Sequence, residues 1–122
     1  MENLILIDSI AMVTPEHNGK VIVAGSHGGR VAAEHYAFPI MPKLVFFNDA
    51  GMGKNNAGIG GVVFLGEKGI AAATVDTMSA MIGDSKDAYE NGIISYVNNP
   101  AEIMGLRVGM SVKEAVDIVN IT

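Results

Sequence analysis

Three short apolar runs recur along the first two thirds of the chain, and each is followed by glycine and polar residues. They are residues 20–24 (KVIVA), 43–47 (KLVFF) and 70–75 (IAAATV). A continuous apolar run of this length predicts a strand buried on both faces of a sheet. Residues 4–13 (LILIDSIAMV) predict a first strand that Asp8 interrupts. The pattern therefore predicts a sheet of about four strands.

Helical patterns separate these strands. Residues 30–37 (RVAAEHYA) carry apolar side chains at helical spacing, and Pro39 and Pro42 are expected to end that helix. Residues 57–69 (AGIGGVVFLGEKG) predict a glycine-rich helix that stops at Gly69. The small residues of that helix would allow close packing on the sheet or on a partner helix. Alternating strands and helices predict parallel strands joined by right-handed crossovers.

The last third of the chain is predicted to be helical. Asp84 is a candidate helix cap, and Ser111 with Glu114 forms a capping box for the last helix. Gly105 is expected to end the helix between these two. One face of the helix after Asp84 would then carry Tyr89, Ile93, Tyr96 and Val97. The two tyrosines on this face are interpreted as core side chains.

The predicted element order is β, β, α, β, α, β, α, α. This order indicates a small Rossmann-like three-layer α/β fold, with a mostly parallel sheet of about four strands and helices on both faces. At 122 residues, the chain is expected to form a single α/β domain spanning 1–122.

Composition narrows the possible partners. The net charge of −5 gives none of the basic surface that nucleic-acid binding needs. No basic amphipathic helix and no apolar run of about 18 residues points to a membrane. The N-terminus lacks the basic start of a signal peptide, and the chain has no cysteine, so we expect a cytoplasmic protein.

Charged residues make up 17% of the chain, against about 25% in typical domains. A shortage of charge on a small domain indicates that part of its surface is covered by another subunit, so we expect a homo-oligomer. The alternative is that glycine and alanine merely inflate the apolar share.

Polar, glycine-rich loops follow the three buried strands. The loops are residues 25–29 (GSHGG), 48–55 (NDAGMGKN) and 76–84. Ligands of open parallel sheets bind outside the carboxyl ends of the strands. Because these loops follow parallel strands, all three are expected to share one edge of the sheet and to form one ligand site.

The first loop, GSHGG, has the composition of an anion-binding turn. Its glycines would let backbone N–H groups approach a ligand, and the following helix N-terminus favours negative charge. Ser26 could donate to the anion or act as a nucleophile, and His27 could transfer protons. A Ser26–His27 dyad is not expected, since adjacent side chains diverge. The structural alternative is a tight turn that needs positive φ, with His27 as a cap.

The second loop partly matches the phosphate-loop pattern G-x-x-x-x-G-K-[ST]. Gly53 and Lys54 fit, whereas Asn48 replaces the first glycine and Asn55 replaces the hydroxyl that binds magnesium. These departures argue against nucleotide hydrolysis. Two interpretations of this loop remain open. In the first, the loop binds an anion and Lys54 supplies a point charge. In the second, Lys54 is a solvated lysine at the helix start and Asp49 caps that helix.

Asp49 and Asp84 supply possible acid–base groups, because two carboxylates facing one pocket can hold split pKa values. Each is also a suitable helix cap, and capping is the favoured interpretation for Asp84. Asp8 either faces solvent near the end of its strand or points into the site. The three histidines show no metal-ligand spacing, so no metal and no cofactor are expected.

Four segments together resemble a family of small uncharacterised bacterial α/β proteins. They are GSHGG, FFNDAGMGKNNAGI, TVDTMSAMIGDSKDAYENGIISYVN and GMSVKEAV, and the resemblance spans roughly residues 7–117. It implies a compact α/β fold. No established activity and no catalytic residue come with it.

Two functions follow as hypotheses, and whether the protein is an enzyme stays open. The first is binding of a small anionic metabolite, a carboxylate or a phosphate, with or without hydrolysis, isomerisation or elimination. The second is a non-catalytic oligomeric subunit or interaction module. The candidate proton-transfer residues are His27, Asp49 and Asp84. The candidate ligand-binding residues are Ser26, Gly28, Gly29, Asn48, Gly51, Gly53, Lys54 and Asn55.

Overall fold

A computed structural model of the chain describes residues 3–51 and 54–121. In these residues, one sheet has the strand order β1-β2-β3-β4-β5. The strands are β1 (Leu4–Ile7), β2 (Val21–His27), β3 (Leu44–Asn48), β4 (Ala71–Val75) and β5 (Ile94–Val97). Strands β1 to β4 are parallel, and β5 runs antiparallel to β4. The predicted α/β fold with a mostly parallel sheet is confirmed.

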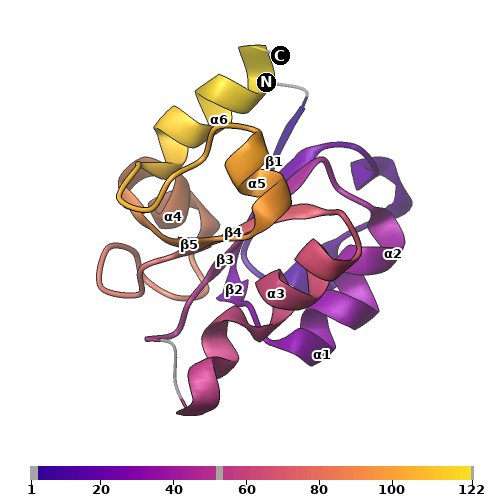
Figure 1. The fold of residues 1–122 in the computed structure, drawn as a ribbon, viewed down its shortest axis with the longest axis horizontal. Coiled ribbons are helices and arrows are strands. Elements are labelled where there is room, and N and C mark those ends of the chain that lie inside the picture. The colour runs from indigo at the N-terminus through magenta and orange to yellow at the C-terminus, as the bar shows by residue number, and fades with distance from the viewer. Residues whose placement is uncertain (1–2, 52–53, 122) are drawn as a thin grey trace.

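The helices cover both faces of this sheet. They are α1 (Arg30–Ala32), the π-helical turn η3 (Ala33–Ala37), α2 (Phe38–Ile40), the 3₁₀ helix η4 (Lys54–Ile59), α3 (Gly60–Glu67), α4 (Ser85–Asn91), α5 (Asn99–Ile103) and α6 (Val112–Ile121). Right-handed crossovers between neighbouring strands in chain order all fall on the same face. Accordingly, α1 to α3 lie on one side of the sheet, and α4 and α6 lie on the other (Figure 1).

The core consists of two layers separated by the sheet. Val21 and Phe46 belong to the layer that contains Val116 of α6, whereas Ile22 and Phe47 belong to the layer beneath α1 to α3. All five side chains are fully buried. Burial of a side chain of this size contributes roughly 1.5–3 kcal/mol. The double burial expected for the continuous apolar runs is confirmed.

The prediction of a helix through residues 93–97 is wrong, because most of this segment forms β5. The helix after Asp84 ends at Asn91, with Gly92 as its C-terminal cap, and Val97 then pairs with Ala73 of β4. Apolar residues at helical spacing suggested a helix, but β-branched and aromatic side chains favour a strand once a partner is available. The sheet therefore has one strand more than expected.

The first strand is also shorter than expected, since β1 ends at Ile7. The Ser9 side chain accepts a hydrogen bond from the backbone N–H of Ala11 and starts a 3₁₀ turn, Ile10–Met12. Pro39 does not end its helix, which continues to Ile40 after the π-helical turn η3. A π turn widens the helix, which offers room for a proline that lacks an N–H.

Several predicted helix ends are confirmed. The Asp84 carboxylate accepts from the N–H of Asp87 at the start of α4. Ser111 and Glu114 make both hydrogen bonds of a capping box. Gly69 adopts a φ of +79° just after α3, where a left-handed residue ends a helix.

Buried Asn98 joins three elements through its side-chain amide. Its Nδ2 donates to the carbonyl oxygens of Val62 (3.0 Å) and Ile70 (2.9 Å). Its Oδ1 accepts from the N–H groups of Ala72 and Ala101, both at 3.1 Å. The amide thus uses its full hydrogen-bonding capacity to hold α3, β4 and α5 together.

Replacing this amide is expected to be costly. Asn98→Ala leaves four backbone groups without their partner, so we expect the free energy of unfolding to fall by about 2–4 kcal/mol. The control is Asn99→Ala, at the exposed neighbouring position, where we expect a change of about 0.5 kcal/mol or less. Denaturant unfolding followed by circular dichroism measures both changes. Similar losses in the two variants would contradict the role of Asn98.

Candidate functional site

The loops after β2, β3 and β4 meet at one edge of the sheet. His27 pairs with Asn48 across β2 and β3, and the N–H of Gly28 donates to the Asn48 carbonyl at 3.1 Å. The N–H of Gly83 donates to the Gly25 carbonyl at 2.6 Å. The third loop therefore crosses the strand ends and reaches β2. The convergence expected from parallel strands is present in the described residues.

His27 lies at the exposed end of β2, next to the start of α1. Its Nδ1 accepts a hydrogen bond from the N–H of Gly29 at 3.1 Å. In the neutral ring, this bond places the proton on Nε2, which becomes a donor toward solvent. The half-buried Ser26 turns elsewhere, since its Oγ accepts from the N–H of Ile10 at 3.0 Å. The two side chains have separate partners and form no dyad.

Close packing explains the first glycine of GSHGG. A Cβ on Gly25 would lie 2.5 Å from the backbone nitrogen of Asp84 and 2.9 Å from that of Ser85. The absence of a side chain therefore lets the start of α4 rest directly on β2. Gly28 is similarly tight, because its Cβ would lie 2.9 Å from the Gly58 carbonyl oxygen. Neither glycine has positive φ, so this turn does not use the left-handed conformation that the structural alternative predicts.

Residues 48–51 form two consecutive turns held by side chains. Asn48 Oδ1 accepts from the N–H of Ala50, and Asp49 Oδ1 accepts from the N–H of Gly51, both at 2.8 Å. Ala50 and Gly51 have φ values of +52° and +74°. A non-glycine residue rarely adopts positive φ, and the side-chain hydrogen bonds stabilise it here. The amides of Ala50 and Gly51 are therefore already occupied.

Asp49 is almost fully buried, with 3% of its surface exposed. Beyond the turn, its Oδ1 accepts from the N–H of Thr77 at 3.0 Å, and its Oδ2 accepts from Ser95 Oγ at 2.7 Å. Ser95 Oγ in turn lies 2.8 Å from Thr74 Oγ1. The carboxylate thus joins the ends of β3 and β4 to β5, and it does not cap η4. Ser95 was missed because its segment was assigned to a helix.

Two carboxylates flank the start of α4. Asp84 is the helix cap favoured from the sequence, while exposed Asp8 accepts from both the N–H (2.9 Å) and the Oγ (2.8 Å) of Ser85. The backbone hydrogen bond from Ser85, followed by the hydroxyl hydrogen bond, lowers the pKa of Asp8. Asp8 therefore stabilises the approach of α4 to β1 while it remains in contact with solvent.

A hollow of about 270 Å³ lies along α4 beside this cap. It is lined by Asp84, Lys86, Asp87, Glu90 and Asn91. Asp87 Oδ2 accepts from the N–H of Met81, and its Oδ1 accepts from the Asn91 side chain. These hydrogen bonds, in that order, lower the pKa of Asp87. Two of the three carboxylates of this hollow, those of Asp84 and Asp87, therefore already bind groups around the helix start, and the third, Glu90, pairs with Lys113.

Some predicted ligand-binding groups lie outside the described part of the chain. Gly53 belongs to residues 52–53, and the side chains of Lys54 and Asn55 are likewise not described. Over residues 3–51 and 54–121, no group of three or more histidine, aspartate or glutamate side chains is placed to hold a metal ion. The same residues include no helix long and apolar enough to cross a membrane.

Comparison of the chain with models of protein families, with curated proteins and with solved structures gave no match. The resemblance seen in the sequence segments stays a prediction. The functional inference therefore rests on the geometry at the sheet edge.

This geometry separates candidate residues with a structural role from a candidate that is free to meet a ligand. Asn48, Asp49, Asp84 and Gly51 hold the loops together, whereas His27 presents a donor to solvent.

Two glycines of GSHGG are expected to respond differently to alanine. A Cβ at position 25 meets backbone atoms that cannot move cheaply, so Gly25→Ala is expected to cost about 1–3 kcal/mol and to displace α4. A Cβ at position 29 meets only the flexible His27 ring, at 2.9 Å from Cε1. Gly29→Ala should therefore cost less and mainly shift the His27 ring resonances. Thermal unfolding and NMR spectra measure these effects, and a reversed order of stability would contradict this account.

Proposed function

We propose that the protein binds a small carboxylate- or phosphate-bearing molecule at the turn between β2 and α1. One observation carries the proposal. The exposed His27 ring, with its Nδ1 occupied by Gly29, stands beside the start of a helical segment whose N-cap residue, Gly29, makes no side-chain cap. The His27 ring and the first backbone N–H groups of the helical segment together offer hydrogen-bond donors and a positive electrostatic potential beside the exposed His27 ring.

The backbone supplies the first part of this anion site. The first N–H groups of a helix have no partner within the helix, and they attract negative charge. At this turn the helical segment continues from Arg30 to Ile40 through α1, η3 and α2. The N–H of Ala33 is the first to donate back, to the Gly29 carbonyl at 3.1 Å. The preceding amides, from Arg30 to Ala32, have no acceptor within the helical segment, and the proposal assigns them to the anion.

Side chains supply the second part. The Nε2–H of neutral His27 donates a hydrogen bond, and protonation of the ring would add a positive charge. Arg30, which the sequence analysis did not select, adds a permanent cation at the first helical position, where its guanidinium lies over the Phe64 ring, 5.2 Å from the ring centre. Ser26, Gly28 and Gly29 complete the turn. Lys54 is included as a further cation only because of its position in the sequence.

The proposal assigns proton transfer to His27. Asp49 and Asp84 each accept hydrogen bonds that hold the fold together, so their carboxylates are committed to structure. An imidazole can both donate and accept a proton, and it could serve hydrolysis, isomerisation or elimination of the bound anion. Binding is the primary claim, and catalysis would follow from it.

Inorganic phosphate is the simplest probe of this site. We expect saturable NMR shifts of the amides of residues 27–32 when phosphate is added. His27→Ala and Arg30→Gln should each weaken binding several-fold, because each removes a charged or hydrogen-bonding group. The control is His35→Ala, an exposed histidine farther along the same helical segment. Absent shifts, or equal affinities in His27→Ala and His35→Ala, would refute the proposal.

Self-association is the second candidate, and exposed apolar side chains favour it. Met78 and Met81 on the loop after β4 are 89% and 69% exposed, and Ile82 beside them is 47% exposed. Ile93 is 39% exposed and borders this loop, since its N–H donates to Ser79 Oγ. Apolar side chains gathered on one surface segment are typical of subunit contacts.

Mass measurement in solution tests this second candidate. We expect a homo-oligomer at micromolar concentration, and we expect Met78→Lys with Met81→Lys to shift it toward monomer, because charge opposes burial. Ile103→Lys is the matched control, since Ile103 is 86% exposed on α5, outside this loop. A monomeric wild-type protein, or equal dissociation by the control, would contradict self-association through this loop.

A further inference from the structure

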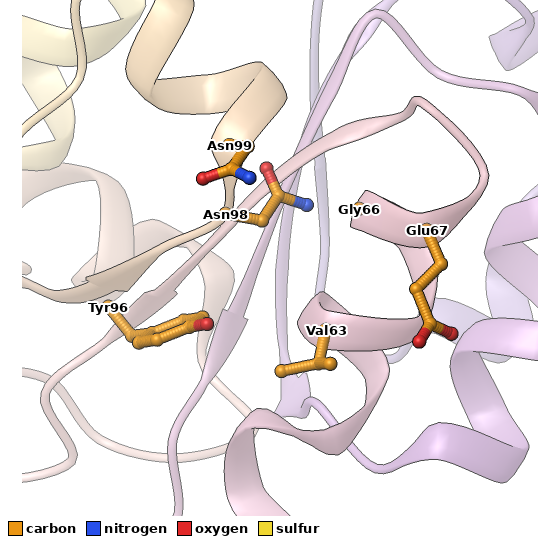
Figure 2. A pocket seen from close by; sticks show the side chains of 6 residues that line it. All are labelled: Val63, Gly66, Glu67, Tyr96, Asn98 and Asn99. Atoms are coloured by element: carbon orange, nitrogen blue, oxygen red, sulfur yellow. The ribbon is translucent and has the colours of Figure 1, made fainter.

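A second cavity lies between α3 and β5, outside the site proposed above. Its volume is about 270 Å³. Val63, Gly66, Glu67, Tyr96, Asn98 and Asn99 line it. Figure 2 shows the Tyr96 ring reaching from β5 toward α3, where Val63 faces it, with Asn98 and Asn99 at the start of α5. No residue of the three sheet-edge loops takes part.

The strand order explains why a cavity forms here. The crossovers α1 to α3 cover β1 to β4 on one face, and α3 precedes β4. Strand β5 runs antiparallel to β4 at the edge of the sheet. The connection between these two strands carries α4, which packs on the opposite face, so no crossover helix covers β5 on the α3 side. Tyr96 points to this side and packs beside the layer beneath α3, where it stays half-buried.

The wall beneath the cavity is rigid. The four hydrogen bonds of Asn98 fix α3 to β4 and α5 at this point. Gly66 allows the close approach, because a Cβ there would lie 3.1 Å from the Cβ of Asn98. A ligand would therefore meet a preformed hollow, which lowers the entropic cost of binding.

Glu67 is the one charged residue that lines the cavity, and Figure 2 shows its exposed side chain extending along the outer side of α3, away from Tyr96. Among the described residues, Glu67 forms no ion pair. The adjacent Lys68 is directed elsewhere, with its Nζ 5.9 Å from the Phe38 ring centre and 5.6 Å from that of Phe64. The Tyr96 ring adds an aromatic face, which attracts cations, and Val63 adds apolar surface.

We propose that this cavity binds a small molecule that carries an ammonium or guanidinium group on a short apolar body. On binding, the exposed Glu67 side chain turns toward the cavity and pairs with the cationic group, and Tyr96 and Val63 contact the apolar body. The Asn99 amide and the Tyr96 hydroxyl offer further hydrogen bonds. The volume lies just below the range of roughly 300–1,000 Å³ for ligand pockets, so the ligand is a compact metabolite and not a cofactor of nucleotide size.

Three probes of nearly equal size and different charge test the proposal. They are benzylammonium, benzyl alcohol and benzoate, each titrated into the full chain and followed by amide NMR shifts. We expect benzylammonium to shift residues 63–67 and 96–99 and to bind more tightly than benzyl alcohol, with benzoate weakest. Equal affinity for the three probes, or shifts only elsewhere, would overturn the proposal.

Two variants locate the charge and the cavity. Glu67→Gln should weaken benzylammonium about two- to five-fold, as expected for one exposed ion pair, and leave benzyl alcohol unchanged. Val63→Phe should weaken all three probes, because the larger ring fills the hollow from a 41% exposed position. Glu34→Gln, at an exposed glutamate on η3, is the control. If Glu67→Gln and Glu34→Gln bind benzylammonium with equal affinity, the assignment of the cation to Glu67 is wrong.

Discussion

The three central strands carry apolar side chains on both faces, and the rest of the structure depends on burying both. Because these strands are neighbours in chain order, every crossover between them falls on one face. The opposite face must be covered by the last third of the chain. To reach that face, the loop after β4 crosses the strand ends, where it bonds to Gly25, Asn48 and Asp49. The crowded sheet edge and the open flank of β5 both result from this path.

The strands that are buried on both faces were predictable from the sequence, whereas the half-buried edge strand β5 was not. The runs at residues 21–24 and 44–47 are apolar without interruption, the run at 71–75 is interrupted only by Thr74, and each forms a strand. Capping residues also gave correct helix ends, because a cap is a local hydrogen bond. Tyr96 and Val97 were misassigned, since their spacing fits both a helix face and a strand, and only pairing with β4 decides between them.

The sequence predicted where the candidate site lies, but it did not predict which hydrogen bonds the side chains of the site make. Strand polarity sufficed to bring His27 and Asn48 to one edge. It did not indicate that the Asp49 carboxylate accepts from Gly51, Thr77 and Ser95, since these partners come from three separate segments. Likewise, the sequence suggested that the glycines of GSHGG serve a ligand, whereas Gly25 mainly makes room for α4. Long-range packing was the missing information in both cases.

The one-sided crossovers also bear on how the protein is made. During synthesis, β1 to β4 and the helices between them leave the ribosome first and can assemble through contacts that are short in sequence. The face carrying Val21, Leu44 and Phe46 is fully covered only after α4 and residues 112–119 have followed. Before these residues are synthesised, the nascent chain exposes a large apolar surface, which favours aggregation or chaperone binding. Helix α6 therefore protects the folding chain from aggregation and also stabilises the folded protein.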